Sequence, residues 1–194
     1  MVTAALAISG LKLARDIVTP EEEVALIRLI EESGPQTMRY DPDNPRASTS
    51  YGWKYDVSHD TFVPCERLPD GLKAVAAAAA RFAGVDPQDF AECLCNRYAP
   101  GAHIQWHCDK PVWDRVIGIS LGASIPMQFR KADGDSWTET EVQMDARSAY
   151  LLSGPARYEW QHHIAPVAAT RYSLTFRTLS PEGAAMQADA ARTA

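Results

Sequence analysis

From residue 91 onward the hydrophobic pattern changes to a period of two residues, and this change limits the fold more than any other feature of the sequence. Alternation of this kind is typical of strands that bury one face, and turn signals such as Pro100-Gly101 separate the short runs. About eight strands at such spacing indicate a sandwich, a barrel or a jelly roll. The predicted strands cover residues 93–99, 102–108, 115–121, 124–130, 136–144, 147–152, 157–163 and 171–179.

Two helices are expected before this strand-rich part. The first covers residues 20–33 and follows Thr19, which can form a capping box with Glu22. The second covers residues 70–82, where an alanine-rich run stops shortly before Gly84, a residue type that favours the C-terminal cap of a helix. We therefore expect an α+β fold in which N-terminal helices pack against the strand core.

The segment between the two helices, residues 36–68, shows no clear period. Long connections of this kind are usually functional lids or disordered segments. Three aromatic residues, Tyr51, Trp53 and Tyr55, cluster in its second half. We predict a lid-like loop here, with the alternative that the three rings pack as an ordinary hairpin.

The length of 194 residues is sufficient for one domain with a full core. We expect a single domain over residues 1–180, with a helical and lid part (1–90), a strand core (91–180), and then a flexible tail or short helix over residues 181–194. No apolar run predicts a membrane span, and the first residues carry no secretory signal. Four cysteines in such a chain do not indicate a disulfide framework, so we expect a cytoplasmic protein. We also expect it to be a monomer.

The net charge of −6 is unevenly distributed. Residues 1–90 hold 14 acidic and 9 basic groups, whereas residues 91–194 hold 11 and 10, and the second part contains eight arginines but only two lysines. Phosphate binding rewards basic residues, and arginine suits the forked recognition of carboxylate or phosphate. The charge thus permits a small local contact with nucleic acid but no broad basic face.

A candidate metal site begins at His107-Cys108-Asp109, where a histidine and a carboxylate share one face of a predicted strand. A second histidine is available from His162 or His163 in another predicted strand, and the alternation of a strand lets only one of the two enter the site. Two histidines and one carboxylate form the facial triad of non-haem Fe(II) oxygenases, which leaves open positions on the metal.

The last predicted strand carries Arg171 and Arg177 on the same face, together with Ser173 and Thr175. Two arginines that point inward beside a metal are unpaired charges unless an anion neutralises them. A dicarboxylic co-substrate satisfies both. The alternative is that both arginines reach solvent from an edge strand.

At this point the chain resembles the AlkB-like Fe(II)- and 2-oxoglutarate-dependent dioxygenases. The resemblance covers about residues 90–179 in family order, with a looser match at Gly52-Trp53. It implies a double-stranded β-helix (jelly-roll) core. The motifs that carry it are Asn96-Arg97-Tyr98-x-Pro100-Gly101, His107-x-Asp109, Ser120-Leu121-Gly122, His162-x-Ile164-x-Pro166 and Arg171-Tyr172-x-Leu174-Thr175-Phe176-Arg177.

The resemblance also implies roles for individual residues. The iron ligands are expected to be His107, Asp109 and His162, which leaves His163 at the surface. Arg171 is expected to pair with the distal carboxylate of 2-oxoglutarate, and Arg177 to lie nearer its metal-chelating end. The remaining expected contacts to the co-substrate come from Asn96, Tyr98 and Ser173, the last standing where the family often has Asn.

The activity implied by the resemblance is oxidative demethylation of an alkylated base in DNA or RNA. It uses Fe(II), 2-oxoglutarate and O₂ and releases formaldehyde, succinate and CO₂. A base must be flipped out or single-stranded to reach such a pocket, and Tyr51, Trp53 and Tyr55 are the candidate stacking residues. His103 is a candidate for lining the substrate entrance.

Alternatives to nucleic-acid repair stay open. The segment Arg157-Tyr158-x-Trp160-x-His162 is similar to the tRNA-modifying branch of the family, and Pro111 departs from the repair-enzyme pattern. An AlkB-like oxygenase that acts on protein side chains or a small molecule is also compatible with the charge. The weakest alternative is a non-catalytic jelly roll or a zinc site that uses Cys93-x-Cys95, whose spacing is unusual for zinc.

Overall fold

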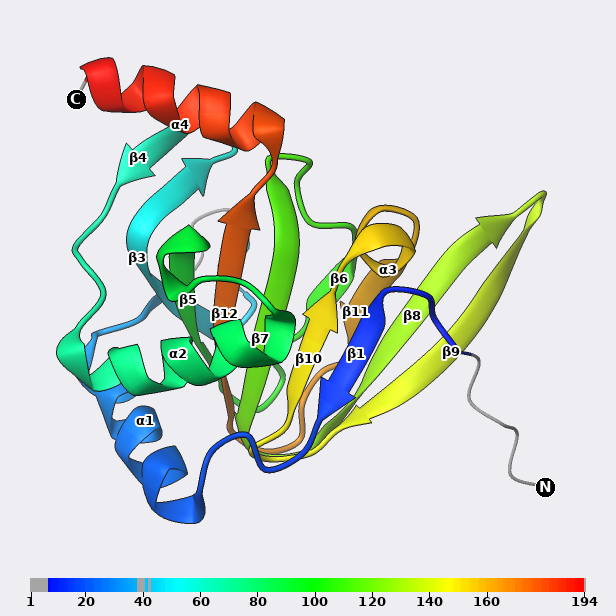
Figure 1. Ribbon diagram of the computed structural model, residues 1–194. Coiled ribbons are helices and arrows are strands. Elements are labelled where there is room, and N and C mark those ends of the chain that lie inside the picture. The colour runs from blue at the N-terminus through cyan, green and yellow to red at the C-terminus, as the bar shows by residue number, and fades with distance from the viewer. Residues whose placement is uncertain (1–6, 38–40, 42, 194) are drawn as a thin grey trace.

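The computed structural model describes residues 7–37, 41 and 43–193 (Figure 1). Its strands form two sheets in which every pairing is antiparallel. The eight strands of the larger sheet are β1 (Leu11–Ala14), β2 (Gln36–Thr37), β3 (Arg46–Asp56), β4 (Thr61–Pro64), β5 (Phe90–Tyr98), β7 (Trp113–Gly122), β10 (Ala149–Leu152) and β12 (Arg171–Leu179). The four strands of the smaller sheet are β6 (Ile104–His107), β8 (Ile125–Asp133), β9 (Ser136–Met144) and β11 (Gln161–Ile164).

The order of the strands brings distant segments together. The larger sheet runs β1-β10-β7-β12-β5-β3-β2, with β4 attached to β3, and the smaller runs β6-β11-β8-β9. The last long strand, β12, therefore lies between β5 and β7 at the centre of the larger sheet (Figure 1). Because of this central position, Arg171 and Arg177 do not stand on an edge strand, and the alternative that they reach solvent from such a strand is wrong.

All eight strands expected after residue 91 are present near their predicted positions, and one boundary is corrected. Residues 157–160 were predicted to be in a strand, but the chain forms the short helix α3 (Gly154–Tyr158) and β11 begins at Gln161. A proline in the first turn, Pro155, is compatible with a helix start because its missing N–H has no intrahelical partner there.

Both predicted helices of the front part are present and cover the outer face of the larger sheet (Figure 1). Helix α1 (Pro20–Glu32) has the expected capping box, in which the Thr19 hydroxyl accepts from the Glu22 N–H and the Glu22 carboxylate accepts from the Thr19 N–H. Helix α2 (Asp70–Ala83) ends at Gly84, whose φ of 68° is the left-handed conformation of a C-terminal cap. The helix-side core includes Leu26, Ile30, Leu72, Ala79, Ile117, Leu174 and Phe176.

The prediction of an irregular lid is wrong for the described part of residues 36–68, because much of it is the long strand β3 and its partner β4. The alternative of an ordinary hairpin is confirmed, and residues 38–40 and 42 lie outside the described residues. The alternation of β3 is obscured in the sequence because polar Thr49 stands on the helix-side face and Gly52 interrupts the strand. Tyr51 is buried on the helix side, whereas Arg46 and Ser50 face the space between the sheets and contact polar groups there.

A second core cluster fills the space between the sheets and includes Trp113, Phe129 and Trp160. Of the two alternatives for the end of the chain, the structure has the helix: α4 spans Pro181–Thr193 and lies over β4, with Met186 packed against this second cluster (Figure 1). Within the described part of the chain, no helix is both long and apolar enough to span a membrane.

Candidate metal and co-substrate site

Two histidines and one aspartate meet between the two sheets. His107 is the last residue of β6, and the antiparallel pairing of β6 with β11 places His162 directly opposite it. Asp109 lies in the loop after β6, so it reaches the site from beyond the strand end and not from the strand face that the sequence predicted. One potential ligand atom from each residue lies within 4.8 Å of the others, and no other such cluster of His, Cys, Asp or Glu occurs among the described residues.

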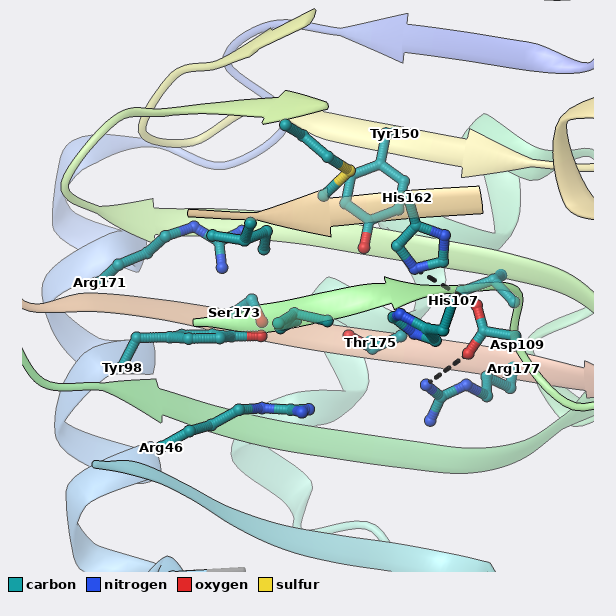
Figure 2. Close-up of a pocket in the computed structure, with 14 residues that line it drawn as sticks. Arg46, Tyr98, His107, Asp109, Tyr150, His162, Arg171, Ser173, Thr175 and Arg177 are labelled. Atoms are coloured by element: carbon teal, nitrogen blue, oxygen red, sulfur yellow. Dashed lines mark hydrogen bonds and ion pairs between the residues drawn. The ribbon is translucent and has the colours of Figure 1, made fainter. Parts of the chain in front are cut away.

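The three side chains are oriented by their neighbours (Figure 2). The Nδ1 atom of His107 is 2.8 Å from the carbonyl of Gln105, which leaves its Nε2 atom for a metal. One carboxylate oxygen of Asp109, Oδ1, accepts from Arg177 Nη2 at 3.0 Å. The other oxygen, Oδ2, lies 3.8 Å from His162 Nε2. The unused nitrogen and oxygen atoms therefore converge on one point.

The electrostatics of the cluster suit metal ligation, which requires a neutral imidazole and an ionised carboxylate. Burial disfavours the imidazolium and lowers the pKa of His162 to about 3, although Asp109 opposes this shift. Burial alone raises the pKa of Asp109, but the Arg177 guanidinium and the two histidines lower it by more, so it lies below its usual range. Both groups are thus in the ligand form near neutral pH.

The loop that carries Asp109 is held by a buried arginine from α3. Arg157 is 1% exposed and donates to the backbone carbonyls of Asp109 at 3.0 Å, Lys110, and Trp113 at 2.9 Å. Its pKa is lowered, chiefly by burial. The sequence indicated Arg157 only as part of a motif and did not predict this contact, because the contact joins helix α3 to a segment 44 to 48 residues earlier in the chain.

Next to the triad, β5 and β12 present the polar residues predicted to bind the co-substrate. The register places Tyr98 opposite Arg171 and Asn96 opposite Ser173. The Asn96 amide donates to the Ser173 hydroxyl at 3.3 Å, and both side chains are buried. Figure 2 shows Tyr98, Arg171 and Ser173 on the side of the sheet that faces the metal cluster, and Asn96 contacts Ser173 without itself lining the pocket.

Arg171 is the buried cation that an anionic ligand would neutralise. It is 1% exposed, its Nε donates to the Ser120 hydroxyl at 3.2 Å, and its Nη1 has no hydrogen-bond partner. No carboxylate of the described residues pairs with it. An unpaired guanidinium at this depth is costly, so the site fits a bound carboxylate.

Arg177 differs from the expectation that the co-substrate neutralises both arginines. Its guanidinium pairs with Glu92 at 2.6 Å as well as with Asp109. Burial lowers the pKa of Arg177, but the two carboxylates raise it by more, above its ordinary value. The carboxylates of Asp109 and Glu92 therefore neutralise the charge of Arg177. Its buried Nε atom has no hydrogen-bond partner and remains available to a ligand.

Several residues that line the pocket were not predicted from the sequence, and Arg46 is the charged one among them. Arg46 on β3 lines the same pocket as the triad and Arg171, and its Nη2 donates to the side-chain amide oxygen (Oδ1) of Asn96 at 2.8 Å. It stands opposite Tyr98 in the β3–β5 pairing. Arg46 could not be recognised from the sequence because it lies in the segment with no clear period. Only strand pairing places it beside Tyr98.

The three aromatic residues predicted to bind substrate are separated by the fold. Tyr51 is 8% exposed and packs under the helices, on the opposite side of the sheet from the pocket, which corrects its assignment as a stacking residue. Trp53 and Tyr55 pack against the cluster between the sheets and do not line the pocket. The strand bends between them and Tyr51 at Gly52, where φ is +83° and a Cβ atom would lie 2.4 Å from the carbonyl oxygen of Ala91.

The two other histidines considered from the sequence lie outside the pocket. His163 faces away from the triad and stacks on Trp106, with ring centroids 4.9 Å apart, as predicted for the histidine next to the ligand. His103 precedes β6 and interacts with Asn44 through its backbone and with the Gly101 carbonyl through Nδ1. It is not among the residues that line the pocket.

Comparison with known proteins identifies the family. A model of the 2OG-Fe(II) oxygenase superfamily matches residues 10–177, and this range contains all three members of the triad. The chain belongs to this superfamily. Within it the chain is AlkB-like: the alpha-ketoglutarate-dependent dioxygenase AlkB of Salmonella typhimurium is 32% identical over 145 residues, which cover 66% of this chain and 63% of that protein.

A further relative is the tRNA (carboxymethyluridine(34)-5-O)-methyltransferase alkbh8 of Xenopus tropicalis, 29% identical over 166 residues. That match covers 81% of this chain, and the chain spans about a quarter of the length of this relative and its mouse counterpart. The solved structure of OsALKBH1 has a TM-score of 0.70 at 16% identity and covers 87% of this chain and 96% of its own, which confirms the predicted jelly-roll fold.

Membership of the superfamily confirms the predicted enzyme class, a 2-oxoglutarate-dependent dioxygenase, and its cofactors Fe(II), 2-oxoglutarate and O₂. The residues present fit both groups: the triad has the donor set of an iron site, and the orphaned Nη1 of Arg171 lies in the same pocket.

Proposed function

We propose that this chain oxidatively demethylates alkylated bases in nucleic acid. The observation that carries the proposal is the combination, in one pocket, of a two-histidine, one-aspartate cluster with a buried guanidinium that lacks a carboxylate partner. Such a pocket supports oxidation of a C–H bond with a dicarboxylate as co-substrate. A nucleic-acid substrate is supported by the relatives, whose names include AlkB, a tRNA methyltransferase and an alkylated DNA repair protein.

Individual residues have distinct tasks in this proposal. His107, Asp109 and His162 hold Fe(II), and Arg171 binds the distal carboxylate of 2-oxoglutarate. Asn96, Tyr98, Ser173 and the Nε of Arg177 complete the polar wall that orients the co-substrate. When bound, Fe(II) and 2-oxoglutarate would activate O₂, which is the oxidant: one oxygen atom would enter succinate as 2-oxoglutarate loses CO₂, and the other would oxidise the methyl carbon, which would leave as formaldehyde.

The protein contributes orientation and exclusion of water. Arg177 holds the Asp109 carboxylate by its Oδ1 atom, so that Oδ2 points toward the histidines. Apolar side chains that include Val116, Met127 and Ile164 close the pocket around the polar groups. A dry, ordered pocket keeps the reaction on the bound substrate.

The experiment measures succinate formed from 2-oxoglutarate in the presence of Fe(II), together with mass spectrometry of methylated DNA, RNA and tRNA oligonucleotides. We expect turnover and loss of the methyl group by the native chain, and neither in His107→Ala or Asp109→Ala. His163→Ala is the matched control, because His163 points out of the site, and it should retain activity. Unchanged turnover in both ligand variants would contradict the metal assignment.

The same assay separates the alternatives. Loss of the methyl group from tRNA oligonucleotides alone would favour the tRNA-modifying branch, which the alkbh8 relative supports. Formaldehyde release from a protein or small-molecule extract, and never from oligonucleotides, would show that the substrate is a protein or a small molecule and not nucleic acid. A cytoplasmic location and a monomeric state stay predictions.

A further inference from the structure

The pocket holds one more positive charge than the protein and the known cofactors neutralise. Three arginines line it, Arg46, Arg171 and Arg177, and the two carboxylates near them, Asp109 and Glu92, both pair with Arg177. Fe(II) carries two positive charges and 2-oxoglutarate two negative charges, so loading both leaves the net charge of the pocket unchanged. An excess of one positive charge therefore remains in the loaded site.

The location of the excess charge follows from the contacts of the arginines. Arg177 has two carboxylate partners, and Arg171 is positioned for the co-substrate. Arg46 has a neutral hydrogen-bond acceptor, the side-chain amide oxygen of Asn96, and its Nε is buried with no hydrogen-bond partner. No Asp or Glu of the described residues forms an ion pair with it.

Arg46 is separated from Arg171 by the ring of Tyr98. The guanidinium carbon of Arg171 lies 4.9 Å from the centroid of that ring and the guanidinium carbon of Arg46 lies 5.5 Å from it, and Figure 2 shows the two side chains on opposite sides of the ring. Arg171 is almost fully buried, whereas Arg46 is partly exposed. Arg171 thus lies deep in the pocket, and Arg46 lies nearer its mouth.

The two guanidinium groups also create a positive potential at this wall. Burial raises the pKa of Tyr98, but the charges of Arg46 and Arg171 and the hydrogen bonds to its hydroxyl lower it by more, so the pKa lies below its ordinary value. A second anion is therefore favoured next to Arg46, on the side of the pocket that is open to solvent.

We propose that Arg46 binds an anionic group of the primary substrate, a backbone phosphate next to the base that is oxidised. This inference rests on the proposed function, since it assumes a nucleic-acid substrate. Phosphate suits a guanidinium that has free N–H donors, and a single contact at the pocket mouth agrees with a chain that has no broad basic face. Arg46 is then a substrate-positioning residue, distinct from the co-substrate contact Arg171.

The test measures binding and not turnover. The full chain is loaded with Mn(II) and the unreactive analogue N-oxalylglycine, and a fluorescein-labelled single-stranded DNA with one 1-methyladenine is titrated by anisotropy. Arg46→Gln should weaken binding by about tenfold and reduce the salt dependence, the slope of log K against log salt, by about 0.7. Arg46→Lys should restore part of the affinity.

Two controls define the result. Arg97→Gln removes the same charge from β5 on the helix side, where Arg97 pairs with Glu31, and should leave oligonucleotide binding nearly unchanged. Oligonucleotides in which one phosphate beside the methylated base is an uncharged methylphosphonate should bind the native chain more weakly, and Arg46→Gln should add no further loss for the phosphate that it contacts.

Each outcome has a separate meaning. Equal binding by the native chain and Arg46→Gln would overturn the phosphate contact and leave the proposed function standing. If Arg46→Gln instead lowers affinity for N-oxalylglycine as strongly as Arg171→Gln does, Arg46 belongs to the co-substrate site and the inference is wrong. If the native chain binds none of the DNA or RNA oligonucleotides, the proposed function fails, and the inference fails with it.

Discussion

Replacing Arg157 with methionine is expected to weaken both the fold and the metal site. The guanidinium of Arg157 is the shared donor to three backbone carbonyls of the loop that carries Asp109. Methionine fills a similar volume but donates no hydrogen bond. The loop then loses the contacts that fix the Asp109 backbone relative to β11.

The magnitude follows from the buried groups that lose their partner. A buried carbonyl left without a donor costs about 1–3 kcal/mol, and the removal of a buried charge offsets part of the total for three carbonyls. We expect the free energy of unfolding to fall by about 2–4 kcal/mol. For a chain of this length, this corresponds to a decrease in Tm of about 5–15 °C.

Two measurements check this prediction. Urea denaturation of the metal-free chain gives the loss of stability, and titration with Co(II), followed by its absorption bands, gives the metal affinity. Residues that orient a metal ligand typically change the affinity by about 10–100-fold when they are replaced. Arg157→Lys, which keeps one donor group, should recover part of both quantities.

Arg115→Met is the matched control because Arg115 also donates to a backbone carbonyl, that of Ala83, but far from the metal cluster and with a side chain 38% exposed. It should change stability by less than Arg157→Met and leave the Co(II) affinity unchanged. A folded Arg157→Met with native Co(II) affinity would refute the role of Arg157 in positioning Asp109. Native stability would refute the hydrogen-bond argument as well.

Two further predictions concern the charges at the triad. In the metal-free chain, the pKa of His162 is about 3 when folded and about 6.5 when unfolded, so the unfolded chain gains a proton first and stability falls as pH decreases from about 6.5 toward 3. Between pH 7 and pH 5 the loss is about 2 kcal/mol, and His162→Gln should remove it from urea denaturation curves; parallel pH profiles for the two proteins would contradict the assignment. Arg177→Met leaves the buried carboxylates of Asp109 and Glu92 without their cation and should destabilise the metal-free chain by about 3–5 kcal/mol in the same assay. Adding Glu92→Gln should recover part of this loss, and an additive double variant would show that Glu92 and Arg177 are not coupled.

Local patterns identified most of the elements that build the site. The capping box at Thr19, the cap at Gly84 and the alternation of the strands after residue 91 depend on neighbours in the sequence, and the structure has each of them. The same pattern failed over β3, since Thr49 is a polar residue on the helix-side face and Gly52, with a positive φ, interrupts the alternation. The start of β11 was misplaced because α3 is only one turn long.

The composition of the candidate site was also largely available from spacing and family motifs. His107, Asp109, His162 and Arg171 were all named, and the structure brings them to one pocket. Choosing His162 over His163 needed the family motif, because alternation shows only that the two side chains point to opposite faces.

What the sequence alone determined is which residue types and which strand faces were available: a triad donor set, a pair of arginines on one strand face and a core of about eight strands. The tertiary structure decided which of these meet. Arg46, Tyr98 and Arg171 form one row only because β3, β5 and β12 are neighbours, and Arg177 is neutralised because the fold brings Glu92 on β5 and Asp109 beside it. Pairing between distant strands is a property of the whole sheet, so no local sequence pattern encodes it. This pairing leaves Arg46 as a cation without a carboxylate partner among the described residues.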